Sequence, residues 1–340
     1  MTDLLNIHNL KVEFDTDEGR ILAVDNVILE LQEGQILGLV GESGSGKSVT
    51  AKSIMQLNAD NAVYGDNSKI VLEGQDVLKF KTNQDLKVIR GGKVSMIFQE
   101  PMASFAPAIS IGDQMVEVLL LHKKISKEKA KSISIDMLDR VGIADADKRF
   151  KQYAFELSGG MRQRAMIAMA LSTMPKLLLA DEPTTALDVT IQAQVIDLIK
   201  NIVAEYKMGV IFITHDLSVI AQTVDYVAVM YLGTIVESGP VREIISNPKH
   251  PYTQGLIEAL PDLNNLDKPL KPIPGDIPSP LERPTGCVFH TRCKLFESGV
   301  CDNAVPPLSE YAKKHTVACL KVNTNAVHYT HLTLPTICHW

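Results

Sequence analysis

Short apolar runs alternate with longer amphipathic segments over most of the chain. The apolar runs, and one stretch of apolar–polar alternation, predict β-strands at residues 10–14, 36–40, 94–98, 176–180, 210–214 and 226–231. Apolar positions at helical spacing predict helices at residues 47–57, 126–141, 160–171 and 191–206. Because apolar strands separated by helices are typical of a parallel sheet covered on both faces, the pattern predicts an α/β fold.

Two changes in the pattern divide the chain. Between the predicted strands at 94–98 and 176–180 the pattern is mostly helical, which indicates an inserted helical subdomain at about residues 100–172. Seven prolines then fall between Pro261 and Pro284, a composition typical of a stiff, extended linker. We therefore expect a main domain over residues 1–260, followed by a linker and a small extension over residues 261–322.

The bulk composition excludes some classes of protein. With 45% hydrophobic and 22% charged residues, the balance is that of a soluble globular protein. The net charge of -6, with acids and bases mixed along the chain, gives no support for a nucleic-acid partner. We see no signal peptide, and the longer apolar runs fall far short of the roughly 20 residues that span a bilayer. Any role at a membrane would therefore depend on docking to other subunits.

A glycine-rich segment joins the first apolar strand to the helix that follows it. It fits the pattern G-x-x-x-x-G-K-S/T, and the residues are Gly41, Glu42, Ser43, Gly44, Ser45, Gly46, Lys47 and Ser48, with Val49 next in the helix. Glycines let backbone N–H groups converge on phosphate oxygens, and the helix N-terminus adds partial positive charge. Lys47 would supply a cation to the β- and γ-phosphates, and Ser48 a hydroxyl ligand to Mg²⁺. The segment therefore predicts a site for a nucleoside triphosphate.

Two adjacent acids follow the predicted strand at 176–180. A buried central strand would deliver Asp181 and Glu182 to the carboxyl edge of the sheet, where ligands bind in open α/β folds. Alone, such a pair is more often a solvated turn. With the phosphate loop in the same chain, we expect Asp181 to hold Mg²⁺ and Glu182 to orient or deprotonate the attacking water.

Residues 157–164 read Leu-Ser-Gly-Gly-Met-Arg-Gln-Arg. This segment resembles the signature motif of ABC ATPases, usually written LSGGQ, and Met161 at its fifth position resembles the peptide-transporter branch of that family. A Ser-Gly-Gly turn at a helix N-terminus offers N–H groups and a hydroxyl to an anion. The resemblance implies that Ser158, Gly159 and Gly160 close over the γ-phosphate of an ATP held by a partner domain.

Other family positions follow in the expected order, and the resemblance covers about residues 4–322. It implies that Gln99 is the Q-loop residue that contacts Mg²⁺ and the attacking water, beside the membrane-subunit contact. It also implies that Asp188, in Ala186-Leu187-Asp188, belongs to the loop that crosses between two nucleotide domains. By the same resemblance His215 contacts the γ-phosphate and Phe14 stacks on adenine. A histidine after a strand is usually structural, and an aromatic residue on an alternating strand often belongs to a core.

The sequence departs from the peptide-transporter pattern at two places. Phe105-Ala106 stands where Leu-Asn is usual, and Ala154-Phe155 precedes Glu156 where Pro-His is usual. Both lie in or near the helical subdomain, so they bear on subunit docking and not on ATP hydrolysis.

The cysteines gather at the end of the chain. None of the five occurs before Cys287, and four have the spacing Cys287-x5-Cys293-x7-Cys301-x17-Cys319. Four thiolates suit a tetrahedral metal site, although the paired C-x2-C spacing of common zinc sites is absent. Residues 250–256 and 286–293 resemble the C-terminal extension of dipeptide and oligopeptide transporter ATPases, and this resemblance favours a four-iron four-sulfur cluster. Zinc, empty thiols and disulfides remain alternatives.

Cys338 does not belong to that set. The segment Tyr329-Thr330-His331-Leu332-Thr333-Leu334-Pro335-Thr336 resembles a translated sequencing adapter, so residues 323–340 are expected to be a non-native tail.

The resemblance implies a fold and a function together. We expect a P-loop ABC nucleotide-binding domain with an inserted helical subdomain and a small cysteine-bearing extension, which binds ATP and Mg²⁺. It would power an importer of dipeptides or oligopeptides from the cytoplasmic face of the membrane. Its partners would be two transmembrane permease subunits, a second ABC ATPase subunit and, indirectly, an extracellular peptide-binding protein. The alternatives are a soluble ABC ATPase of DNA repair or translation, a catalytically silent subunit, or an importer of nickel or another small solute.

Overall fold

The computed structural model describes residues 3–184, 188–260 and 272–322. Ala186, Leu187, the first part of the predicted linker, Cys338 and the predicted tail lie outside these ranges. Within them, no helix is both long and apolar enough to cross a membrane.

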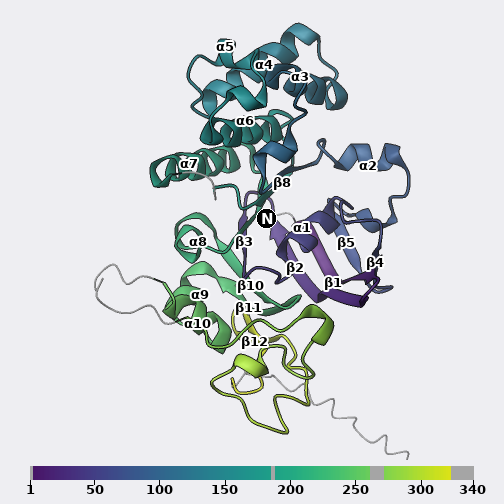
Figure 1. The fold of residues 1–340 in the computed structure, drawn as a ribbon, viewed down its shortest axis with the longest axis vertical. Helices are drawn as coiled ribbons and strands as arrows, with labels where there is room; N and C mark the ends of the chain where they lie inside the picture. The colour runs from purple at the N-terminus through teal and green to yellow at the C-terminus, as the bar shows by residue number, and fades with distance from the viewer. Residues whose placement is uncertain (1–2, 185–187, 261–271, 323–340) are drawn as a thin grey trace, which may run out of the picture.

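The centre of the molecule is an eight-stranded sheet (Figure 1). Its strand order is β12-β13-β11-β10-β3-β9-β8-β7, and the last five strands of this order are parallel. The bounds are β3 (Ile36–Val40), β7 (Val94–Ile97), β8 (Leu177–Asp181), β9 (Gly209–Thr214), β10 (Tyr226–Tyr231), β11 (Thr234–Pro240), β12 (Ser309–Ala312) and β13 (His315–Val317). The predicted α/β sheet is therefore present, and its parallel strands lie within one or two residues of their predicted positions.

The central strands are buried on both faces. In β3, Ile36 and Val40 join one apolar cluster, whereas Leu37 and Leu39 join the other. Since successive side chains of a strand point to opposite faces, an apolar strand of this kind needs cover on both sides. This burial explains why these strands were recognisable from their composition.

An antiparallel sheet covers one of these faces together with helix α1 (Lys47–Ile54). It contains β1 (Asp3–Thr16), β2 (Gly19–Gln32), β4 (Ala62–Tyr64), β5 (Lys69–Leu72) and β6 (Gln75–Asp76). The alternation at residues 10–14 therefore belongs to a much longer strand that pairs with β2 over most of its length.

Most of the secondary structure outside the two sheets is helical. Between β7 and β8 the chain forms a helical group, uppermost in Figure 1, of α3 (Ile111–His122), α4 (Lys127–Arg140), α5 (Ala146–Phe150) and α6 (Gly159–Ser172). The other helices are α2 (Asn83–Ile89), α7 (Val189–Tyr206), α8 (Leu217–Thr223), α9 (Val241–Ser246) and α10 (Pro251–Glu258). The helical pattern around residues 100–172 thus corresponds to a helix-rich insertion between two neighbouring strands of the main sheet.

The C-terminal part is joined to the main sheet by backbone pairing. Strand β13 pairs antiparallel with β11 through Glu237 opposite Val317 and Ser238 opposite Thr316. Beside this seam, the buried carboxylate of Glu237 contacts His315 Nε2 at 2.8 Å and accepts the backbone N–H of His250 at 3.0 Å. The sequence did not predict this seam, because neither short strand carries a clear periodic pattern.

Candidate functional site

The phosphate loop lies between β3 and α1, as predicted. Gly44 and Gly46 have φ values of +76° and +98°, in the left-handed region that favours glycine. A methyl group on Gly46 would lie only 2.6 Å from the carbonyl oxygen of Ala23 in β2. The loop can therefore fold closely against β2 only because Gly46 lacks a side chain.

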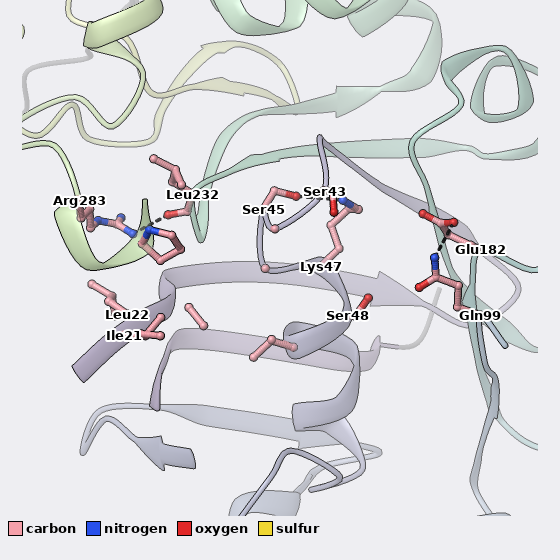
Figure 2. A pocket seen from close by; sticks show the side chains of 15 residues that line it. Ile21, Leu22, Ser43, Ser45, Lys47, Ser48, Gln99, Glu182, Leu232 and Arg283 are labelled. Carbon is pink, nitrogen blue, oxygen red and sulfur yellow. Dashed lines mark hydrogen bonds between the residues drawn. The ribbon is translucent and has the colours of Figure 1, made fainter. Parts of the chain in front are cut away.

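The loop lines an open cavity of about 220 Å³ (Figure 2). The lining residues are Ser43, Gly44, Ser45, Gly46, Lys47, Ser48 and Val49 of the predicted loop, with Gln99, Glu182, Ile21, Leu22, Ala23, Leu232, Pro280 and Arg283. Gly41 and Glu42 do not line it. The cavity thus brings together the loop, Gln99, which is the predicted Q-loop residue, and one of the two predicted acids.

Lys47 occupies the inner side of the loop. Its ammonium donates to the carbonyl oxygens of Gly41 and Glu42, each at 2.7 Å, and to Ser45 Oγ at 3.0 Å. Burial lowers the pKa of Lys47, while the nearby carboxylates of Glu182, Asp181 and Glu42 raise it. A cation held among uncharged acceptors can exchange them for phosphate oxygens, which bind it more strongly.

Asp181 ends the buried strand β8 and is only 4% exposed. Burial raises the pKa of this carboxyl group, whereas a hydrogen bond with Ser48 lowers it. A carboxylate and a hydroxyl beside a phosphate loop are hard oxygen ligands of the kind that Mg²⁺ takes. The residues present therefore fit a magnesium ion bound together with nucleotide phosphates.

Glu182 is held by two of the other predicted residues. Its Oε2 accepts from Gln99 Nε2 at 3.1 Å, as Figure 2 shows, and its Oε1 lies 3.0 Å from His215 Nδ1. The backbone of Glu182 has φ +48°, and its N–H donates to the carbonyl of Ile213 in β9 at 2.9 Å. The three side chains therefore come together at the carboxyl ends of β7, β8 and β9, next to the phosphate loop.

The signature turn lies at a different place. Ser158 caps the N-terminus of α6, where its hydroxyl accepts the N–H of Met161 at 3.3 Å. Ser158 and Gly160 line a second cavity together with Asp188, and no residue of the phosphate loop lines it. The predicted phosphate-binding residues thus divide into two separate groups within one chain.

Phe14, which the sequence predicts to stack on adenine, lies in strand β1. Phe14 is partly buried against the core beneath the antiparallel sheet and does not line the cavity. Its partner in β2, Ile21, does line the cavity. Adenine stacking by Phe14 stays a prediction.

Two cavity residues come from the predicted linker and had no signal in the sequence. The guanidinium of Arg283 donates to Asp25 Oδ2 at 2.9 Å and to Thr234 Oγ1 at 2.8 Å, and also to the carbonyl of Leu232. The linker's last residues therefore pack against β2 and β11, with Pro280 beside the cavity.

The four predicted cysteine ligands all carry free thiols. Burial, with a smaller contribution from the other three thiols, raises the pKa of Cys287 to about 11. Within the described ranges, however, no group of three or more Cys, His, Asp or Glu side chains could hold a metal ion. The thiols are neighbours without disulfides, and their arrangement supports neither zinc nor the predicted four-iron four-sulfur cluster.

Comparisons with known proteins agree with the geometry. A family model described as ABC transporter matches residues 24–185, and one described as oligopeptide/dipeptide transporter, C-terminal region, matches residues 236–301. The chain is 46% identical to a putative peptide import ATP-binding protein of Brucella melitensis, over 94% of this chain and 97% of that protein. It is 45% identical to the oligopeptide transport ATP-binding protein OppD of Salmonella typhimurium, over 94% and 93%. It is 44% identical to the dipeptide transport ATP-binding protein DppD of Bacillus subtilis, over 96% and 97%.

Solved structures share the fold. The dimeric ATP-binding cassette MJ0796, bound to ADP and Pi, superposes with a TM-score of 0.63 at 24% identity, over 70% of this chain and 99% of that one. The cbiO1 protein of Clostridium perfringens, part of the ABC transporter complex cbiONQ, gives 0.61 at 21% identity, over 73% and 92%.

Proposed function

The chain belongs to the ATP-binding subunits of ABC transporters, in the group named for peptide import, and we propose that its ATP hydrolysis powers the uptake of dipeptides or oligopeptides. One observation carries the proposal. Glu182, held by Gln99 and His215, lies beside a phosphate loop whose lysine and serine are positioned for nucleotide and Mg²⁺. The intact set of groups argues against a catalytically silent subunit.

These side chains can supply the chemistry of hydrolysis. Lys47 would exchange its loop acceptors for phosphate oxygens, and Ser48 with Asp181 would hold Mg²⁺, which would offset the phosphate charge. Glu182 then accepts a proton from the attacking water, while Gln99 and His215 fix the direction of its two carboxylate oxygens. General-base help of this kind contributes about 10²–10⁴-fold to a rate.

The separation of the two cavities supports a shared ATP site. Ser158, Gly160 and Asp188 offer a hydroxyl, a helix N-terminus and a carboxylate, but they do not line the cavity of their own phosphate loop. We propose that a second ABC ATPase subunit, either another copy or a relative, completes each site with its signature turn.

Exposed apolar side chains at the start of the helical insertion and just before its last helix, α6, fit the proposed permease contact. Phe98, Met102, Tyr153 and Phe155 are exposed, and the rings of Tyr153 and Phe155 stack with centroids 5.5 Å apart. Exposed apolar residues that cluster are typical of interaction sites. We propose that two transmembrane permease subunits dock here, with the chain on the cytoplasmic face of the membrane and an extracellular peptide-binding protein as an indirect partner.

Replacing Glu182 by glutamine tests the catalytic proposal. Glu182→Gln in the assembled transporter should still bind ATP but should lose at least about 100-fold in turnover, because the amide cannot accept the proton. Glu30→Gln, an exposed glutamate of β2 outside the cavity and the proposed docking residues, is the matched control and should keep its turnover. Unchanged turnover in Glu182→Gln would refute the assignment. Uptake of labelled dipeptide, oligopeptide and Ni²⁺ by the transporter in vesicles then identifies the cargo.

For the cysteine set we propose the four-iron four-sulfur cluster, within an extension that spans residues 261–322 beside a main domain of residues 1–260. The proposal rests on the resemblance of this extension to that of peptide-transporter ATPases and on four free thiols, the number of ligands that such a cluster takes. Protein purified without oxygen should contain about four iron and four sulfide per chain. Replacing Cys301, the buried cysteine, by serine should reduce both, whereas a stoichiometric zinc content or no metal at all would refute the proposal.

A further inference from the structure

Glu42, the second residue of the phosphate loop, faces away from the nucleotide cavity. Residues 43–49 line that cavity, but Glu42 does not. Its backbone N–H donates to Tyr252 Oη at 2.8 Å, and its carbonyl oxygen accepts from Lys47 Nζ at 2.7 Å. Glu42 is therefore bonded to the phosphate-binding lysine on one side and to helix α10 on the other.

The carboxylate of Glu42 is bound by Arg292, which lies 250 residues further along the chain. Nη1 lies 2.7 Å from Oε2 and Nη2 lies 3.3 Å from Oε1, a two-point pairing. Only 4% of the Arg292 side chain is exposed. Two-point pairing of guanidinium with carboxylate fixes direction as well as distance, and lysine cannot reproduce it.

Arg292 is itself held firmly. Its Nε donates to the carbonyl of Pro274 at 3.1 Å, and its guanidinium lies 5.8 Å from the centre of the Tyr231 ring. The rings of Tyr231, Tyr252 and Phe289 pack together with centroids 4.7 to 5.3 Å apart. A backbone carbonyl and a cluster of packed aromatic rings therefore hold the guanidinium in place against the loop.

We propose that Arg292 is a positioning residue for ATP binding. By pairing with the Glu42 carboxylate on the side of the loop away from the cavity, it holds the phosphate loop and the Lys47 ammonium in the geometry that binds the triphosphate. The inference rests on the proposed ATP-binding function. It makes the C-terminal extension part of the nucleotide site, although Arg292 itself touches no nucleotide. Only the Arg292 side of the pair is buried, since the Glu42 side chain is 28% exposed. Removing the Glu42 charge would therefore leave a buried guanidinium uncompensated, whereas removing Arg292 would release Glu42 and the loop to turn toward water.

The test is a double-mutant cycle read by ATP affinity. The variants are Arg292→Met, Glu42→Gln and the two together, with Lys294→Met as the matched control, because Lys294 is an exposed cation of the same extension that pairs with Glu258. The dissociation constant of ATP with Mg²⁺ is measured by titration calorimetry on the full chain. Thermal unfolding of each variant verifies that it is folded.

Each single change should raise the dissociation constant on the order of tenfold, which corresponds to about 1.4 kcal/mol. The double variant should bind ATP no more weakly than the single variant with the lower affinity, because the two substitutions remove the same interaction. The control should stay within about twofold of wild type. In the assembled transporter, the KM for ATP should rise more than kcat falls.

Three results would overturn the proposal: wild-type affinity in folded Arg292→Met, single effects that multiply in the double variant, or a lower kcat at unchanged KM. If Arg292→Met does not fold, Glu42→Gln alone decides, since it keeps the side chain's size and a hydrogen-bonding oxygen. Failure of the wild-type chain to bind ATP would refute the proposed function itself. Wild-type binding with unaltered variants would refute only the role of Arg292.

Discussion

Replacing Gly46 by alanine measures how closely the phosphate loop depends on the absence of one methyl group. Gly46 precedes α1 with φ +98°. An added Cβ would lie 2.6 Å from the carbonyl oxygen of Ala23 and 2.8 Å from Cε of Met230. The methionine end could move, but the Ala23 carbonyl belongs to the paired strand β2, so the backbone itself must shift.

The cost can be estimated from two contributions. The left-handed backbone costs an L-residue about 1–2 kcal/mol. Insertion into filled space costs a further 1–3 kcal/mol, roughly. Gly44 is the natural control, because its φ is +76° but no atom lies within 4 Å of its Cβ position. Gly44→Ala should therefore incur only the first cost, and the two variants should differ by about 1–3 kcal/mol.

The assay is thermal unfolding of both variants without nucleotide. In a chain of this size 1 kcal/mol moves Tm by about 2 °C, so Gly46→Ala should melt about 2–6 °C below Gly44→Ala. Equal midpoints would refute the argument, because they would mean that the contact with β2 has no energetic consequence.

Three further outcomes are expected. Lys47→Ala should weaken ATP binding by at least about 100-fold in equilibrium dialysis, because it removes charge-assisted bonds to two phosphates; retained binding would contradict the assignment. Ser158→Ala should lower the free energy of unfolding by about 1 kcal/mol through the lost cap and should prevent ATP-dependent pairing of two subunits in size-exclusion chromatography; normal pairing would argue against the shared site. Burial lowers the pKa of His250 from 6.5 to about 4, so the unfolded chain takes up the proton first as pH falls. The chain should thus lose about 3 kcal/mol of stability between pH 6.5 and 4, and His250→Asn should flatten this dependence in denaturant titrations; an unchanged slope would exclude His250 as its source.

Much of the candidate site could be predicted from the sequence because local rules govern it. The apolar runs of β3 and β8 needed burial on both faces, and Lys47, Asp181 and Glu182 follow directly from the ends of these strands. The roles of His215 and Gln99 were predicted only from the family resemblance, which the other motifs in the chain carry. The structure brings both into contact with Glu182, because β7, β8 and β9 are neighbours in the sheet.

What the sequence by itself determined, then, is the phosphate loop, the acids after β8 and the family, since each is written in a short run of adjacent residues. Only the tertiary structure decided that the signature turn lies apart from its own phosphate loop, that Arg283 reaches the cavity, and that Arg292 holds Glu42. These contacts join residues as much as 258 positions apart, as with Asp25 and Arg283. No local pattern encodes them, because an arginine in a proline-rich or cysteine-rich segment looks the same whether it faces water or a distant carboxylate.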